Sequence, residues 1–171
     1  MKPRLSDAEL RQVQSRAEAK FYKWCTEQLD DTFIVLHSRE WINRDERGAH
    51  EGETDFTICS ADSGLIVIEV KGGWVRIDDD RQWYSLDRNS VAHRIKNPFG
   101  QARDQRHEFE KALECDGAWR KGGSRVTVGY AVFFPNVIDA TSLVDIQERP
   151  RALIGGSQAS TQVVSGGLDL P

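Results

Sequence analysis

The feature that most constrains this chain is an apolar run that carries an acid and a base near its end. Residues 65–68 read Leu-Ile-Val-Ile, and Glu69, Val70 and Lys71 follow. Apolar residues without alternation are typical of a strand that is covered on both faces. A second run of this kind spans residues 126–134. We therefore expect an α/β fold in which helices flank a mixed central β-sheet that contains both runs.

The remaining elements follow from apolar periodicity and turn signals. In chain order they are a helix over 6–29, a strand over 32–37, a polar loop over 43–52, a strand over 53–59, a hairpin over 74–77 and 82–86, and a helix over 97–115. The first helix begins with a capping box from Ser6 to Glu9, and Asn97 followed by Pro98 is a typical helix start. Because the strand over 126–134 follows a crossover helix, we expect it to pair in parallel.

Size and charge limit the classes of function. The 171 residues suit one domain, and 39 % of them are hydrophobic, which excludes a disordered chain. The chain has 23 basic and 27 acidic residues, a net charge of −4. This balance argues against a protein that coats nucleic acid by charge alone, but it leaves room for a local basic groove or a metal-dependent nuclease.

The periodicity fades after residue 135. The last residues are rich in Gly, Ser and Gln, without a helical or strand pattern. We expect one folded domain over residues 1–135. Residues 136–171 are expected to be a poorly structured C-terminal segment, either a tail or the edge of a longer protein.

The N-terminus and the cysteines bear on localisation. No run approaches the roughly 20 apolar residues of a membrane span, and residues 1–6 lack the apolar stretch of a secretory signal. Cys25, Cys59 and Cys115 are widely spaced, so we expect buried thiols rather than a disulfide framework or a zinc site. These features predict a cytoplasmic protein that does not engage a membrane.

A cluster of charged residues is expected where the core should be. Glu69 and Lys71 stand two residues apart on a strand and therefore share a face. The short connection between residues 59 and 65 predicts antiparallel pairing, which brings Asp55 beside Glu69. Two adjacent carboxylates repel each other, and a divalent cation removes that cost. Asp55, Glu69 and the Val70 carbonyl offer hard oxygen ligands for Mg²⁺ or Mn²⁺, with Lys71 placed to orient an attacking water.

A plainer interpretation of the same residues is structural. Glu69 and Lys71 can form a buried salt bridge while Asp55 caps a loop, and a spacing of two residues by itself does not separate this possibility from a metal site. The position of the charges inside an apolar strand favours the metal site, because charge in mid-strand often marks a functional site.

Several motifs together resemble the nuclease-related domain, NERD, of the PD-(D/E)xK nuclease superfamily. They are Glu18, Gly52-Glu53-Thr54-Asp55-Phe56, residues 65–72 with Glu69-Val70-Lys71, Trp83-Tyr84, and Asn97-Pro98-Phe99-Gly100-Gln101-Ala102. The resemblance covers roughly residues 10–135. Thr54 stands where the superfamily name has proline, and that position is loosely kept.

The resemblance implies a restriction-endonuclease-like core and a set of site residues. By it, Asp55 is the metal-binding aspartate, Glu69 the second acidic ligand and Lys71 the catalytic lysine. Glu18 is the glutamate of the first helix, and Gln101 is the glutamine of the second. Domains of this family commonly precede other domains, so a helicase or kinase domain in the same full-length protein is implied as a partner.

Some of these residues also have plainer interpretations. Glu18 can be an ordinary surface partner of Lys20 or Lys23, and Gln101 a glutamine on a solvated helix face. A set of basic residues either lines a DNA path or is scattered over the surface: Arg44, Arg47, Arg76, Lys96, Arg103 and Arg106.

The sequence therefore leaves three functions open. The first is a nuclease that uses Mg²⁺ or Mn²⁺ to hydrolyse phosphodiester bonds in DNA. The second is a non-catalytic nucleic-acid-binding or adaptor module, for example the accessory domain of a helicase. The third is an acid–base site that processes a sugar or a protein, which a lysine beside two acids fits poorly.

Overall fold

The computed structural model covers most of the chain up to residue 137 and a few positions beyond. It describes residues 4–13, 15–45, 48–115, 117, 119, 126–137, 143, 153–155 and 163–164, with the backbone alone at 39, 41–45, 48–51, 153–155 and 163–164. In chain order the elements are α1 (Asp7–Gln12), α2 (Arg16–Gln28), β1 (Phe33–Asp45), β2 (Gly48–Ser60), β3 (Gly64–Val70), β4 (Trp74–Ile77), β5 (Trp83–Leu86), β6 (Ala92–Ile95), α3 (Pro98–Cys115), β7 (Val128–Phe134), β8 (Leu153–Gly155) and β9 (Val163–Val164).

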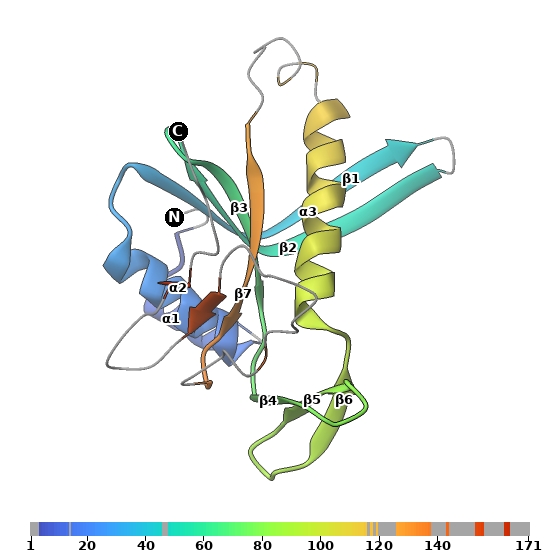
Figure 1. Ribbon diagram of the computed structural model, residues 1–171. Coiled ribbons are helices and arrows are strands. Elements are labelled where there is room, and N and C mark those ends of the chain that lie inside the picture. Colours follow the sequence, from blue (N-terminus) through green and yellow to red (C-terminus); the bar gives the residue numbers. More distant parts are fainter. Residues whose placement is uncertain are drawn as a thin grey trace.

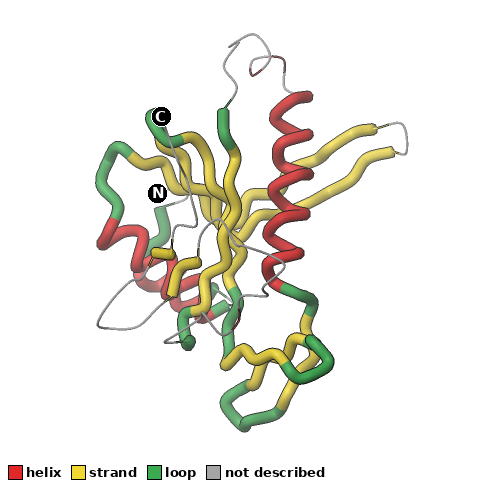
Figure 2. Tube along the Cα trace, in the orientation of Figure 1, coloured by secondary structure: helices red, strands yellow, loops and turns green. Residues whose placement is uncertain are grey.

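A mixed sheet with helices on both sides organises the described part of the chain. Its strand order is β1-β2-β3-β7-β8-β9, and a separate small sheet has the order β4-β5-β6. The central strand β3 pairs antiparallel with β2 and parallel with β7. Helices α1 and α2 lie on one side of the sheet and α3 on the other (Figure 1; Figure 2). The predicted fold class and both strand pairings are confirmed.

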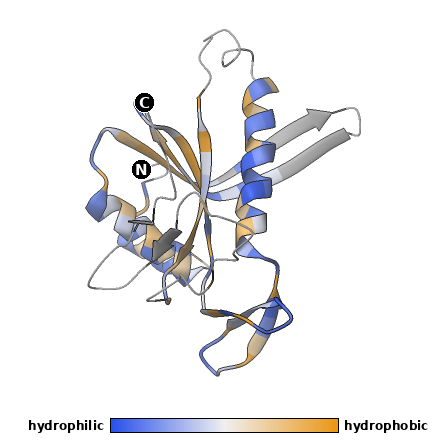
Figure 3. Cartoon of the chain, in the orientation of Figure 1, coloured by the Kyte–Doolittle hydropathy of each residue, from blue (hydrophilic) through white to orange (hydrophobic). Residues whose placement is uncertain are grey.

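The alternation of side chains along β7 shows why its residues are all apolar. Ala131 and Phe133 pack into the cluster under α1 and α2, whereas Val132 and Phe134 pack into the cluster under α3. On the first side, Phe21 of α2 is fully buried and its ring centroid lies 4.7 Å from that of Phe133. Hydrophobic colour accordingly follows the central strands, and hydrophilic colour the outer side of α3 (Figure 3).

The N-terminal helical region differs from the predicted single helix over 6–29. The capping box is confirmed, because the Glu9 amide donates to Ser6 Oγ at 3.3 Å and Glu9 Oε2 accepts from the Ser6 amide at 2.8 Å. The uninterrupted helix is wrong, because α1 ends and α2 begins with a new cap at Ser15. The Ser15 hydroxyl accepts from the Glu18 amide at 3.2 Å, so the residue satisfies a helix start rather than a helix interior.

The hairpin of β1 and β2 is longer than predicted, and the loop prediction for residues 43–52 is wrong. The backbone pairing continues through Asn43↔His50 to Asp45↔Gly48. An antiparallel pair satisfies its own inner amides and carbonyls, so strands that project beyond the core need no apolar pattern. This projection is visible at the right of Figure 1.

Cys25, Cys59 and Cys115, all among the described residues, form no disulfide, and only one of them is fully buried. Cys25 is buried in α2, Cys59 is half-buried and Cys115, the last residue of α3, is exposed. The prediction of buried thiols is therefore wrong for Cys115, because a helix end is less covered than its middle. Burial raises the pKa of Cys25 to about 12, which keeps that thiol protonated.

The small sheet packs beside the start of α3. The predicted hairpin is confirmed as β4 and β5. The third strand, β6, is short and mostly exposed, and it was not predicted. Trp83 packs on Phe99 with ring centroids 5.8 Å apart. Asn97 Oδ1 accepts from the Phe99 amide at 2.9 Å, which confirms the predicted cap of α3.

The C-terminal segment over 136–171 lies mostly outside the described residues. Within its described positions, Val137 and Leu143 are buried, and β8 pairs in parallel with β7 and antiparallel with β9. The Gly-rich stretch before β7 also lies largely outside the description.

None of the helices in the described ranges combines the length and apolar character needed to cross a bilayer.

Gly73→Ala is expected to lower the free energy of unfolding by about 1–3 kcal/mol. Gly73 has φ +79°, and a Cβ there would meet Ser85 Oγ and lie 2.8 Å from the Leu86 carbonyl oxygen. Urea denaturation measures the change. In the matched variant Gly100→Ala, the new Cβ makes only ordinary contacts at 3.8 Å within α3, so no loss is expected. Equal stability of the two variants would contradict this account of the bend.

Candidate active site

Asp55 and Glu69 meet where β2 separates from β3. The pairing of these strands ends at Phe56↔Ile68, one step before Asp55 would oppose Glu69. The Val70 amide lies beyond that last pair, and it donates to Asp55 Oδ2 at 2.7 Å. A side-chain carboxylate thus takes the place of a strand carbonyl. Asp55 lies within β2, so it does not cap a loop as in the structural alternative.

Glu69 is a buried carboxylate with partners at both oxygens. It is 3 % exposed. Lys71 Nζ lies 2.6 Å from Oε1, and Gln105 Nε2 on α3 donates to Oε2 at 2.7 Å. The Lys71 side chain is 23 % exposed, so its ammonium lies at the edge of the site rather than inside the core. The salt bridge of the structural alternative is therefore present, in the same place as the candidate site.

The carboxyl group of Asp55 holds its proton unusually well. Burial is the largest cause, and the negative charge of Glu69 adds to it; together they raise the pKa of Asp55 to about 7. The Val70 hydrogen bond and the Lys71 charge oppose this shift, and the charge of Glu18 adds to it. The charges of Glu69, Glu18 and Lys71 therefore all act on the Asp55 carboxyl group.

Glu18 is positioned by α2 and contacts β1. Its Oε2 lies 3.1 Å from His37 Nε2, a buried histidine that stacks on Phe56 with ring centroids 4.6 Å apart. Lys20 is engaged elsewhere, since its Nζ donates to Asn136 Oδ1 at 2.8 Å. Glu18 is therefore not the partner of Lys20 that the plainer interpretation suggested. His37 is a neighbour of the site that the sequence reasoning missed, because its contact depends on the β1–β2 register.

The glutamine that reaches Glu69 is Gln105, not Gln101. Gln101 lies one turn earlier on α3, and among the described residues its side chain makes no hydrogen bond. One helical turn moves a side chain about 5–6 Å along the axis, which decides which of the two meets the carboxylate. The spacing of Gln101 and Gln105 did place both on one face. The family-derived role of Gln101 stays a prediction.

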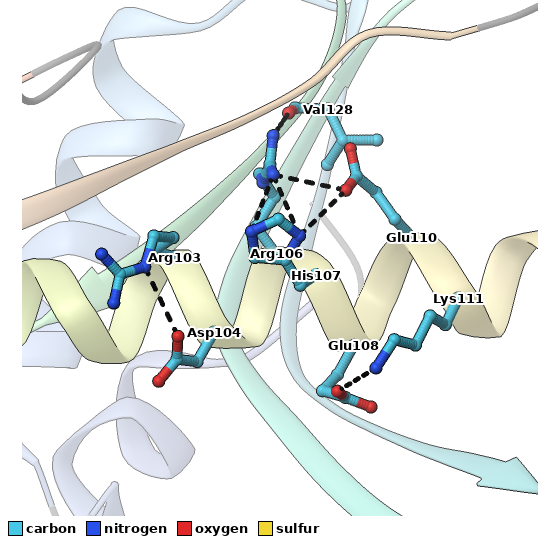
Figure 4. A network of polar contacts seen from close by, with 8 residues as sticks. All are labelled: Arg103, Asp104, Arg106, His107, Glu108, Glu110, Lys111 and Val128. Carbon is cyan, nitrogen blue, oxygen red and sulfur yellow. Dashed lines mark hydrogen bonds and ion pairs between the residues drawn. The ribbon is translucent and has the colours of Figure 1, made fainter. Parts of the chain in front are cut away.

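The basic side chains of α3 are paired with acids of the same helix. Arg103 Nε lies 3.5 Å from Asp104 Oδ1, and Arg106 Nη2 lies 3.6 Å from Glu110 Oε2 (Figure 4). Arg106 also donates to the Val128 carbonyl of β7 at 3.4 Å. These two arginines stabilise the helix and its docking more than they form a bare basic path. The side chains of Arg44 and Arg47 lie outside the described residues.

The donor set fits a hard divalent cation. Within the described residues, no three His, Cys, Asp or Glu side chains gather into a metal-binding group. The oxygen donors available are the carboxylates of Asp55 and Glu69 with the Val70 carbonyl, and Mg²⁺ commonly uses one or two carboxylates with waters in its other positions. Gln105 Oε1 is buried beside Glu69 without a hydrogen-bond partner, so it is an acceptor suited to a coordinated water.

Asp55→Asn is expected to stabilise the metal-free protein at pH 8 by up to about 4 kcal/mol and to change little at pH 4. The folded state holds the Asp55 proton up to about pH 7, while the unfolded state releases it near pH 4. Wild-type stability should therefore fall as pH rises through this window. Asn keeps an acceptor for the Val70 amide without the charge. Thermal denaturation in EDTA from pH 4 to 8 measures the difference, and parallel curves for the two proteins would contradict it.

Gln105→Ala is expected to cost about 1–3 kcal/mol in the free energy of unfolding, because it leaves a buried Glu69 oxygen without its donor. Gln101→Ala is the matched control on the same helix and should cost almost nothing. Chemical denaturation of both variants compares them. A larger loss for Gln101→Ala would show that the contact of α3 with Glu69 is wrongly assigned.

Comparison with known proteins identifies the family to which the chain belongs. The family model of the nuclease-related domain, NERD, matches residues 14–135, which include α2, β3, Asp55, Glu69 and α3. No curated protein and no solved structure matches the chain. The match spans well over half of the sequence, and the chain belongs to the nuclease-related domain family.

Proposed function

We propose that this chain is a metal-dependent nuclease that hydrolyses phosphodiester bonds in DNA. The observation that supports it most is the pair of adjacent carboxylates, half-buried Asp55 and buried Glu69. Burial and the charge of Glu69 raise the pKa of Asp55, while Lys71 stands beside them. Two adjacent carboxylates lower the stability of a fold unless something neutralises them. The pair is therefore best explained by a cation that it binds.

Each residue of the pair and its neighbours has a distinct part in this proposal. Asp55, Glu69 and the Val70 carbonyl would hold Mg²⁺ or Mn²⁺. Lys71 would leave Glu69 in part to orient the attacking water and to stabilise the charge that develops on the phosphate oxygens. Glu18 adds negative charge beside Asp55, and Gln101 would contact a water or a phosphate near the start of α3.

The bound ion would supply positive charge that lowers the pKa of a water and attracts the phosphodiester. The protein supplies the burial that makes such charges act strongly. Lys71 is the cation that this chain itself contributes, and its partial exposure leaves it within reach of a bound strand.

Purified full-length chain is expected to cleave labelled DNA in Mg²⁺ or Mn²⁺ and not in EDTA. Asp55→Asn and Lys71→Met should lower the rate by at least about 100-fold, because each removes a ligand or a charge at the reacting phosphate. Lys111→Ala, an exposed position paired with Glu108 on α3, serves as the matched control and should keep the rate. Cleavage that survives in both site variants, or none by folded protein on single- and double-stranded DNA, would overturn the proposal.

A non-catalytic nucleic-acid-binding or adaptor module is the second candidate. The ion pair of Lys71 with Glu69 favours it, because a carboxylate with both oxygens engaged is a complete structural unit without metal. In that case nucleic acid should bind equally in EDTA, in Mg²⁺ and in the Glu69→Gln variant. An accessory role beside a helicase or kinase domain fits this candidate as well as the first.

A further inference from the structure

The outer face of the small sheet carries arginine and aromatic side chains in register. Arg76 of β4 lies opposite Tyr84 of β5, which lies opposite Arg94 of β6. Trp74 stands two residues before Arg76 and so shares its face, while Val75 between them packs into the core. We call Trp74, Arg76, Tyr84 and Arg94 the Arg–aromatic face.

Three of these side chains are exposed and Tyr84 is half-buried, and neither arginine has an acidic partner among the described residues. Trp74 is 58 % exposed, and the Arg76 guanidinium carbon lies 5.4 Å from the Tyr84 ring centroid. Arg94 donates to the side chain of Gln82. Over the described ranges of the chain, neither Arg76 nor Arg94 forms an ion pair, unlike Arg106 on α3 (Figure 4).

Positive charge continues from this face into a hollow at its edge. The hollow has a volume of about 540 Å³, and Arg81, Arg94 and Lys96 contribute to its lining. The acidic turn at residues 78–80 bounds the face at the far end of β4. The hollow lies at this same end of the small sheet, because Arg81 directly follows the turn and Ile95 pairs with Trp83 at the start of β5. The charges of Arg81 and Lys96 therefore stand beside the acidic turn, and a polyanion on the face is favoured toward Trp74 at the start of β4.

The Arg–aromatic face is fixed to the strand that carries the candidate site. Three peptide steps separate Lys71 from Trp74, so their Cα atoms are at most about 11 Å apart. The bend between them is held on both sides, because Ser85 Oγ donates to the Gly72 carbonyl at 3.0 Å and Asn136 Nδ2 to the Gly73 carbonyl at 3.4 Å. A strand bound on the face therefore lies close to Lys71.

We propose that the Arg–aromatic face binds a single-stranded segment of nucleic acid, with a base stacked on Trp74 and phosphates at Arg76 and Arg94. An exposed indole beside unpaired guanidinium groups combines stacking with charge, the two terms that bind single strands. In a duplex the bases are stacked inside and offer Trp74 no face. This assignment rests on the proposed function, since it supplies a strand to the same site, but its test does not need cleavage.

Fluorescence anisotropy of a short labelled oligo(dT) with the full chain in EDTA measures this binding without hydrolysis. Trp74→Ala should weaken binding at least about fivefold, whereas Trp74→Phe should retain most of it. Arg76→Ala with Arg94→Ala should reduce the slope of log affinity against log salt by about 1.4. Lys111→Ala, an exposed cation of α3, is the charge control and should leave both readouts unchanged. Retained melting temperatures would exclude misfolding.

Unchanged affinity in Trp74→Ala, or equal weakening in Lys111→Ala, would overturn the assignment. The assignment would also be overturned if duplex DNA bound as tightly as oligo(dT). It would be overturned, too, if polyglutamate, a polyanion without bases, competed with the labelled oligo(dT) as well as single-stranded oligo(U) does. The two proposals fail separately. If DNA cleavage does not depend on Trp74, the nuclease proposal stands and the assignment of the Arg–aromatic face fails. If binding depends on Trp74 but no cleavage occurs, the assignment stands and the nuclease proposal fails.

Discussion

The ion pair of Glu69 with Lys71 is the interaction on which the rest of the site depends. Glu69 is almost fully buried, and removal of one partner from such a pair typically costs about 3–5 kcal/mol, because the other charge stays behind in the core. The i, i+2 spacing on β3 supplies the partner from the same strand. The facing helix then has to offer a polar group, and Gln105 does so at 2.7 Å. One buried acid therefore determines side chains on two elements.

The separation of β2 from β3 gives this pair its neighbour. Strands that continued in register past Phe56 would satisfy the Val70 amide with a backbone carbonyl. Since the strand pairing ends there, the Asp55 carboxylate accepts a hydrogen bond from that amide and is held beside Glu69. The fold thus gives up one ordinary strand hydrogen bond and places a second acid, Asp55, beside Glu69. Burial and the charge of Glu69 raise the pKa of Asp55 to about 7. The cost of that exchange is what links the architecture to the proposed cation.

Sequence reasoning succeeded where a local rule decides the structure. The apolar runs predicted β3 and β7 as strands of one mixed sheet, the crossover helix predicted the parallel pairing of β7, and the cap at Asn97 placed the start of α3. It failed where the pairing of strands or the rotation of a helix decides which residues meet. The polar β1–β2 extension has no apolar signal, Ser15 interrupts an apolar stripe that continues beyond it, and a single turn of α3 separates Gln105 from Gln101. The adjacency of Asp55 and Glu69 was predictable, but the His37 contact of Glu18 depends on a register that the sequence does not show.

A net charge of −4 is compatible with binding a polyanion when the charges are separated in space. Much of the acidity that faces the candidate site is buried in Asp55 and Glu69, where burial and Lys71 limit its reach. On α3, arginines and acids cancel each other within one helix (Figure 4). The arginines of the small sheet have no such partners among the described residues. The local charge at one part of the surface therefore differs from the net charge of the chain. Near Trp74, Arg76 and Arg94 set the electrostatic field that a nucleic acid strand meets.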